Sequence, residues 1–207
     1  MKTYRIHIIR HGKTPANVDG RYIGITDEKL SATGREELLK LRNEGAYPDV
    51  DAVYSGPLSR CVETAKIIYP ENEITVVNGL KECNFGDFEN KTAEELKNNE
   101  IFRQWISGVQ GVYPPNGEST PDFIKRSVVS FAMIVEDLMR DGIRHSAIIT
   151  HGGVIMSVLS TCGLPQRSFS DWMCGFGKGF SLIVTPTMWM QGYKFEVIED
   201  DYDSIED

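Results

Sequence analysis

The sequence IHIIRHGKT occupies residues 6–14, and a second string, AIITHGG, occupies residues 147–153. Each begins with an apolar run typical of a buried strand and continues into a histidine followed by glycine. In an open sheet of parallel strands, ligands bind outside the carboxyl ends of the strands. The sequence therefore predicts that His11 and His151 emerge at strand ends and share one site.

The rest of the chain alternates between predicted strands and helices. Strands are expected at residues 4–9, 51–54, 73–77, 146–149, 180–184 and 194–198. Helices are expected at residues 31–44, 57–69, 92–106, 120–140 and 153–161, the first with Leu38, Leu39 and Leu41 on its inner face. This order predicts an α/β domain of three layers, in which a mostly parallel sheet has helices on both faces.

Residues 84–119 are expected to form a small cap inserted into this domain. They contain the capping pattern Thr92-Ala93-Glu94-Glu95 and end in a loop rich in glycine and proline. The remaining blocks fit a single domain over residues 1–207. Residues 199–207 carry six acidic side chains and are expected to be a solvated tail.

Composition limits the classes of partner and compartment. The chain of 207 residues is 41% hydrophobic and has a net charge of −8, most of it in the tail, so a nucleic-acid partner is not expected. It has no apolar run of membrane-spanning length and no apolar N-terminal stretch, which favours a cytoplasmic protein without a membrane partner. A monomer and a homodimer both remain open.

Four cysteines are present, at positions 61, 83, 162 and 174, without C-x-x-C spacing. This favours reduced thiols. Cys61 and Cys83 each follow a candidate site residue, and they are expected to be small buried fillers, with oxidative inhibition of the site as the alternative.

Arginine side chains accompany the two histidines. Arg10 directly precedes His11, and Arg60 lies in the first turns of the helix after the second predicted strand. Guanidinium groups bind phosphate oxygens in a bidentate manner. Their charge also favours the neutral form of a nearby histidine, and a neutral imidazole could attack phosphorus. Arg10, Arg60 and a protonated His151 would then neutralise the phosphoryl oxygens.

A leaving alcohol needs a proton donor. Glu82 follows the third predicted strand beside apolar residues, where its carboxyl pKa could be raised. By spacing alone, Asp87 and Glu89 are alternatives. No metal site is expected, because His145 falls in a turn, His7 points away from His11 or lies below it, and the sequence has no H-E-x-x-H string.

With these residues the chain resembles the histidine phosphatase superfamily, in the branch of phosphoglycerate mutases and small bacterial phosphatases such as α-ribazole phosphatase. The similarity extends over nearly the whole chain. It rests on Arg10-His11-Gly12-Lys13-Thr14 with Asn17, Tyr22-Ile23-Gly24, Leu30-Ser31-Ala32-Thr33-Gly34, Ser55-Gly56-Pro57-Leu58-Ser59-Arg60 with Thr64-Ala65, Leu80-Lys81-Glu82 with Phe85-Gly86, Gly117-Glu118-Ser119, and Thr150-His151-Gly152.

The resemblance implies a phosphoglycerate mutase-like fold and a phosphohistidine on His11, with Glu82 as general acid and then base. It implies that the phosphoryl group is held by Arg10, Arg60 and His151. Substrate contacts are expected from Thr14, Asn17, Ile23, Gly24 and Gly152. Neither a cofactor nor a metal is implied, because arginines carry the compensating charge.

Departures from the family pattern favour hydrolysis of a small phosphomonoester over isomerisation. Lys13 stands where many members have Glu, Ile23 replaces a polar residue of the mutases, and Gly153 replaces Asn. The cap segment has no paired arginines for a substrate carboxylate. Expected pocket walls are Ile23, Phe85, Phe102, Trp105 and Tyr113, with Phe88 nearby, which suggests a substrate with an apolar or aromatic portion. The alternatives are a mutase and a catalytically silent phosphate-binding protein.

Overall fold

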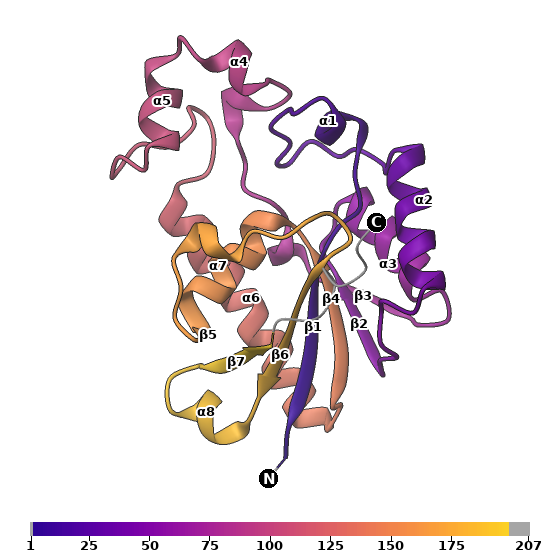
Figure 1. Ribbon diagram of the computed structural model, residues 1–207. Helices are drawn as coiled ribbons and strands as arrows, with labels where there is room; N and C mark the ends of the chain where they lie inside the picture. The colour runs from indigo at the N-terminus through magenta and orange to yellow at the C-terminus, as the bar shows by residue number, and fades with distance from the viewer. Residues whose placement is uncertain (1, 199–207) are drawn as a thin grey trace.

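The computed structural model describes residues 2–198, so Met1 and the acidic tail at 199–207 lie outside the described residues. Seven strands form one sheet in the order β3-β2-β4-β1-β6-β7-β5 (Figure 1). The strands are β1 (Tyr4–Arg10), β2 (Ala52–Ser55), β3 (Ile74–Val76), β4 (His145–Thr150), β5 (Gly163–Leu164), β6 (Gly179–Val184) and β7 (Phe195–Ile198).

The sheet is mostly parallel, as predicted. Strand β1 pairs in parallel with β4, and β2 pairs in parallel with both β4 and β3. Only β6 is reversed among the described strands, because it is antiparallel to both β1 and β7. In the β1–β4 register Arg10 lies opposite Thr150, so His11 and His151 leave the sheet side by side at the same edge.

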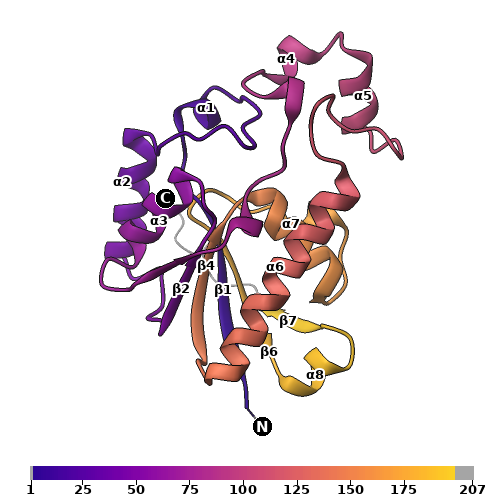
Figure 2. The same ribbon diagram turned by 180° about the vertical axis from the view of Figure 1, so that it is seen from behind.

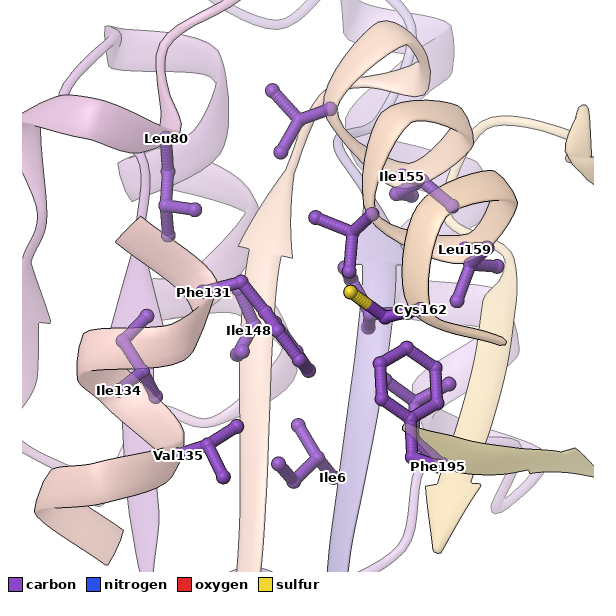
Figure 3. Packing of buried hydrophobic residues seen from close by; sticks show 14 of the residues in the cluster. Ile6, Leu80, Phe131, Ile134, Val135, Ile148, Ile155, Leu159, Cys162 and Phe195 are labelled. Carbon is purple, nitrogen blue, oxygen red and sulfur yellow. The ribbon is translucent and has the colours of Figure 1, made fainter. Parts of the chain in front are cut away.

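Helices cover both faces of the sheet, because neighbouring residues of a strand point to opposite faces and pack against different helices. Ile6, Ile8 and Ile148 belong to one apolar cluster with side chains of α6 (Thr120–Asp141) and α7 (Gly152–Cys162). Figure 2 shows these two helices over one face of the sheet, and Figure 3 shows Ile6 and Ile148 beside them. The neighbouring residues Ile9 and Ile149 point to the opposite face, where they join side chains of α2 (Ala32–Asn43) and α3 (Ser59–Ile68). Two apolar clusters therefore sandwich the sheet.

Short elements of residues 84–119 lie above the carboxyl edge of the sheet (Figure 1). They are η2 (Gly86–Phe88), α4 (Ala93–Leu96) and α5 (Glu100–Ile106). Buried Phe88, Leu96 and Phe102 give this cap an apolar cluster of its own. The single helix predicted for residues 92–106 is wrong: the chain breaks after Leu96, and Asn99 starts a new helix by accepting a hydrogen bond from the Phe102 amide.

The sequence missed several short elements. These are α1 (Pro15–Val18), η1 (Asn78–Leu80), β5, η3 (Phe169–Trp172) and α8 (Pro186–Met190). Two details also differ from the prediction. Leu39 of α2 is 43% exposed rather than on the inner face, and α3 begins at Ser59, after Pro57. No helix between residues 2 and 198 combines the length and apolarity needed to cross a bilayer.

Candidate active site

A cavity of about 490 Å³ opens between the cap and the carboxyl edge of the sheet. Six of the predicted site residues line it: Arg10, His11, Asn17, Ile23, Glu82 and Gly152. The others, Thr14, Gly24, Arg60 and His151, are not among its lining residues. The site therefore has a layer facing the cavity and a buried layer behind it.

His11 is buried directly after β1 and is held in one tautomer. Its Nδ1 lies 2.7 Å from the Gly12 carbonyl oxygen. A carbonyl can only accept, so Nδ1 carries the proton and Nε2 keeps its lone pair. Burial, together with the charges of Arg60 and Arg10, holds the pKa of His11 well below its ordinary value. His11 is therefore neutral at pH 7 and has a free ring nitrogen, as a nucleophile requires.

His151 is fully buried behind His11, at the N-terminus of α7. The two imidazole rings meet edge to face with centroids 5.1 Å apart, and Cys61 Sγ lies 3.4 Å from Nε2 of His151. Burial, Arg60 and His11 all depress the pKa of His151. The sequence analysis expected a protonated His151. Without a bound anion the site favours the neutral form instead, because burial and the surrounding positive charge disfavour the imidazolium.

Arg10 lies under an aromatic ring that the sequence analysis missed. Its Nη1 donates to the Cys174 carbonyl at 2.8 Å, and its guanidinium carbon lies 3.8 Å from the centroid of Phe176. Phe176 also contacts the His11 ring at a centroid distance of 5.7 Å. Phe176 therefore covers both side chains, and no spacing signal in the sequence could have connected it to β1.

Arg60 is 1% exposed and fastens the loop that contains Gly24. Its Nη1 donates to the Thr26 carbonyl at 2.9 Å, and its Nη2 donates to the Gly24 carbonyl at 2.7 Å. The Nε atoms of Arg60 and Arg10 are both buried without a hydrogen-bond partner within the described structure. Buried N–H groups are nearly always satisfied, so two unpaired donors around a neutral histidine form a ready site for an oxyanion.

Glu82 occupies the other side of the cavity lining. Its Oε1 accepts from the Cys83 amide at 2.9 Å, and its Oε2 accepts from the Gly153 amide at 3.1 Å. Burial raises the pKa of Glu82 despite these hydrogen bonds and the two arginines. A Cβ at position 153 would collide with Glu82 Oε1, so a larger residue there would displace the carboxyl group from its present position.

The alternative acids have other functions in the structure. Glu89 accepts hydrogen bonds from the amides of Gly24, Ile25, Thr26 and Phe85 and from the Thr26 hydroxyl. Asp87 accepts from the Asn116 amide group. Neither lines the cavity. Of the three carboxyl groups, only Glu82 faces the space next to His11.

An arginine that the sequence analysis missed holds the Glu82 segment in place. Arg126, on α6, donates to the carbonyls of Gly79 and Lys81 at 2.7 and 2.9 Å and to that of Glu82 at 3.4 Å. It also pairs with Glu118 through Nε and Nη2 at 2.9 and 2.7 Å. Arg126 thereby joins the chain just before the cap segment, and the end of that segment, to the long helix.

Other predicted residues lie near the site without forming its surface. Thr14 caps α1 by accepting from the Asn17 amide, while the Asn17 side chain accepts from the Thr14 amide in return. Lys13 pairs with Glu37 at 2.7 Å, so its charge is directed to α2. His7 is hydrogen-bonded to Ser181.

The two cysteines next to the site are buried thiols. Burial raises the pKa of Cys83 to about 12 and also raises that of Cys61. Both remain protonated at neutral pH and are weak nucleophiles. These observations favour their role as packing residues.

Three of the five expected wall residues line the cavity: Ile23, Phe85 and Trp105. The other two, Phe102 and Tyr113, are not among its lining residues. Phe88 and Phe102 are each 1% exposed inside the cap cluster. Tyr113 lines an adjoining cavity of about 700 Å³ between the cap loop and the start of α6, which shares Trp105, Gly108 and Thr120 with the first.

Known proteins share this sequence pattern and fold. The family description "Histidine phosphatase superfamily (branch 1)" matches residues 6–183. The adenosylcobalamin/alpha-ribazole phosphatase of Escherichia coli strain K12 is 29% identical over 169 residues, which cover 79% of this chain and 82% of that protein. A probable phosphoglycerate mutase of Salmonella arizonae is 28% identical over 166 residues, 78% of this chain and 76% of that protein. Among solved structures, a putative alpha-ribazole-5'-P phosphatase from Escherichia coli has a TM-score of 0.79 at 23% identity over 94% of each chain, a likeness of fold.

Proposed function

Because the chain belongs to branch 1 of the histidine phosphatase superfamily, we propose that it is a phosphomonoesterase that hydrolyses a small-molecule phosphate through a phosphohistidine on His11. One observation carries the proposal. The unpaired Nε donors of Arg10 and Arg60 are buried around a neutral His11 whose Nδ1–H is fixed by Gly12. This arrangement suits a phosphoryl group facing a nucleophilic nitrogen.

In the first step, the Nε2 lone pair of His11 attacks phosphorus and the bond from phosphorus to the alcohol oxygen breaks. Glu82, with its raised pKa, donates its proton to the departing oxygen. Arg10 and Arg60 neutralise the equatorial phosphoryl oxygens. The negative charge of the bound phosphate would also raise the pKa of His151, which can then donate a hydrogen bond to it.

In the second step, the Glu82 carboxylate takes a proton from a water molecule, which attacks the phosphorus of the phosphohistidine. The bond between phosphorus and Nε2 breaks, phosphate leaves, and both His11 and Glu82 return to their starting protonation states. Because the arginines supply the positive charge, the proposed reaction is independent of metal. The four free cysteines fit the proposed cytoplasmic location, where thiols stay reduced.

The experiment is phosphate release from p-nitrophenyl phosphate, 3-phosphoglycerate and α-ribazole phosphate in EDTA, with the wild type and His11→Ala. We expect turnover in the wild type that is lost in the variant. A burst of alcohol release and a ³¹P signal of a phosphoramidate in wild type quenched in alkali, where the P–N bond survives, would identify the intermediate. Turnover that survives in His11→Ala would contradict the assignment of the nucleophile.

A mutase is the second candidate, because a probable phosphoglycerate mutase is among the relatives. It is separated by incubation with 3-phosphoglycerate and the bisphosphorylated cofactor. Isomerisation faster than phosphate release would favour the mutase. A chain that shows neither reaction but binds inorganic phosphate would be the silent phosphate-binding protein.

A further inference from the structure

The walls of the active-site cavity are apolar, whereas its catalytic end carries charged and polar side chains. Beyond the catalytic groups, the lining is dominated by aromatic and aliphatic side chains, including Ile23, Phe85, Trp105, Ile106, Phe169 and Met173. A volume of about 490 Å³ lies within the range of pockets that enclose ligands much larger than a phosphate ion. The part of the substrate beyond the phosphate therefore meets an apolar surface.

Charge in the cavity lining is the second observation. Apart from the catalytic Arg10 and Glu82, Arg21 is the one residue with a charged side chain among the described residues that line the cavity. Arg21 Nη1 already donates to the Asn90 carbonyl at 2.6 Å and to Glu95 at 3.1 Å. Arg21 thus directs its Nη1 to cap residues, and apart from it the described lining has no second cation for a carboxylate or another phosphate.

The third observation concerns where the apolar lining is exposed. Met173 is 67% exposed and Phe169 is 40% exposed, although both belong to the cavity lining. They come from η3 and the residue after it, while Ile106, 56% exposed, comes from the end of α5. A thioether and a phenyl ring at the rim offer an adaptable apolar contact for a flat or bulky group.

From these observations we propose that the site selects phosphomonoesters whose alcohol part is uncharged and carries an aromatic or bulky apolar group, with Met173 and Phe169 as specificity-determining residues. The inference rests on the proposed phosphatase function and adds the substrate class. A phosphate that also bears a carboxylate, such as 3-phosphoglycerate, loses the water around the carboxylate on binding and gains no cationic side chain in return. Such substrates are therefore disfavoured.

The experiment compares three phosphates of primary alcohols, so that intrinsic reactivity stays similar: 2-(1-naphthyl)ethyl phosphate, glycerol 3-phosphate and 3-phosphoglycerate. We expect kcat/KM for the naphthyl compound to exceed that of each of the others at least about tenfold, as burial of an apolar group in a matching pocket provides. Met173→Lys and Phe169→Ala should each reduce this ratio, and Met173→Lys should raise the relative use of 3-phosphoglycerate. Met190→Ala, a change at a 79% exposed methionine of α8, is the matched control and should leave the ratio unchanged.

The outcomes separate the two proposals. Equal kcat/KM for all three substrates, or a ratio that neither rim variant changes, overturns the substrate class while the phosphatase function stands. Hydrolysis of none of the three by the wild type, in an assay where p-nitrophenyl phosphate is also untouched, overturns the phosphatase function and the inference with it.

Discussion

Burial raises the pKa of the Glu82 carboxyl group despite its two backbone hydrogen bonds and the nearby arginines, as a proton donor requires. Glu82→Gln keeps the shape of the side chain but removes the proton. We expect kcat for an alkyl phosphate to fall about 10²- to 10⁴-fold, the usual contribution of general acid–base catalysis. For p-nitrophenyl phosphate, whose leaving group needs little protonation, we expect a smaller loss in the burst phase. Equal losses for both substrates would contradict the role as acid.

The dependence of activity on pH follows from two pKa shifts of opposite sign. His11 must be neutral to attack, and its pKa lies well below 6.5, so kcat/KM rises as pH increases through that low value. Glu82 must be protonated, and its pKa is raised above 4.5, so kcat/KM falls as pH increases through the raised value. We expect a bell-shaped profile, measured with an alkyl phosphate. Glu82→Gln should lack the alkaline limb, and a profile unchanged in this variant would assign that limb to another group.

Site residues that follow a strand closely were predictable from the sequence, because only a few residues separate them from the strand that positions them. Arg10, His11 and Glu82 are of this kind, and all three line the cavity. Phe176 and Arg126 were not predicted, because each contacts residues that are distant in the sequence. Phe176 lies close to the C-terminal end of the chain and packs on Arg10, and Arg126 reaches the Glu82 segment from α6. Such contacts depend on tertiary packing, which leaves no local periodicity.

At the scale of elements, α6 positions the segment that carries Glu82, the proposed acid. Arg126→Met removes three donors to backbone carbonyls around Glu82 while keeping an apolar side chain of similar length. We expect kcat for an alkyl phosphate to fall about 10- to 100-fold, since a displacement near 1 Å has such an effect, and the alkaline limb of the pH profile to move. Arg126→Lys should recover part of this loss.

Arg140→Met is the matched control on the same helix. Arg140 is a surface residue whose partners are Asp137 and Asp141, and surface ion pairs contribute little to stability. Its activity and pH profile should match those of the wild type. If Arg126→Met behaves in the same way, Arg126 does not position the acid.

Helices and strands were predicted correctly where the hydrophobic period extends over many residues. The predictions failed where a local cap sets the end of an element. The 22-residue helix α6 was placed almost to the residue, because its apolar positions repeat over six turns between Ser119 and Gly142. The predicted helix at 92–106 splits because Asn99 offers a better local cap than a continuing helix does. Short pieces such as β5 and α8 depend on tertiary partners, and their own sequences are too short to show a period.

At the scale of the whole molecule, two histidines held neutral inside the fold link its stability to pH. The pKa values of His11 and His151 are both well below 6.5 in the folded chain, mainly through burial, whereas in the unfolded chain they return to about 6.5. As pH falls below about 6.5, the unfolded chain takes up protons that the folded chain does not, so the free energy of unfolding decreases. Two such groups give a slope of up to about 2.7 kcal/mol per pH unit. Glu82 has the opposite sign, because its raised pKa lets the folded chain bind a proton first, and it offsets part of the loss at lower pH.

The measurement is urea unfolding between pH 7.5 and 5.5 in a buffer free of phosphate. We expect His11→Asn to flatten the slope by about one proton, which is about 1.4 kcal/mol per pH unit, because one buried imidazole no longer titrates on unfolding. His145→Gln removes an exposed histidine at the start of β4 and should keep the wild-type slope. If both variants retain that slope, the loss of stability in acid comes from groups outside the site. Holding His11 neutral then does not lower the stability of the fold.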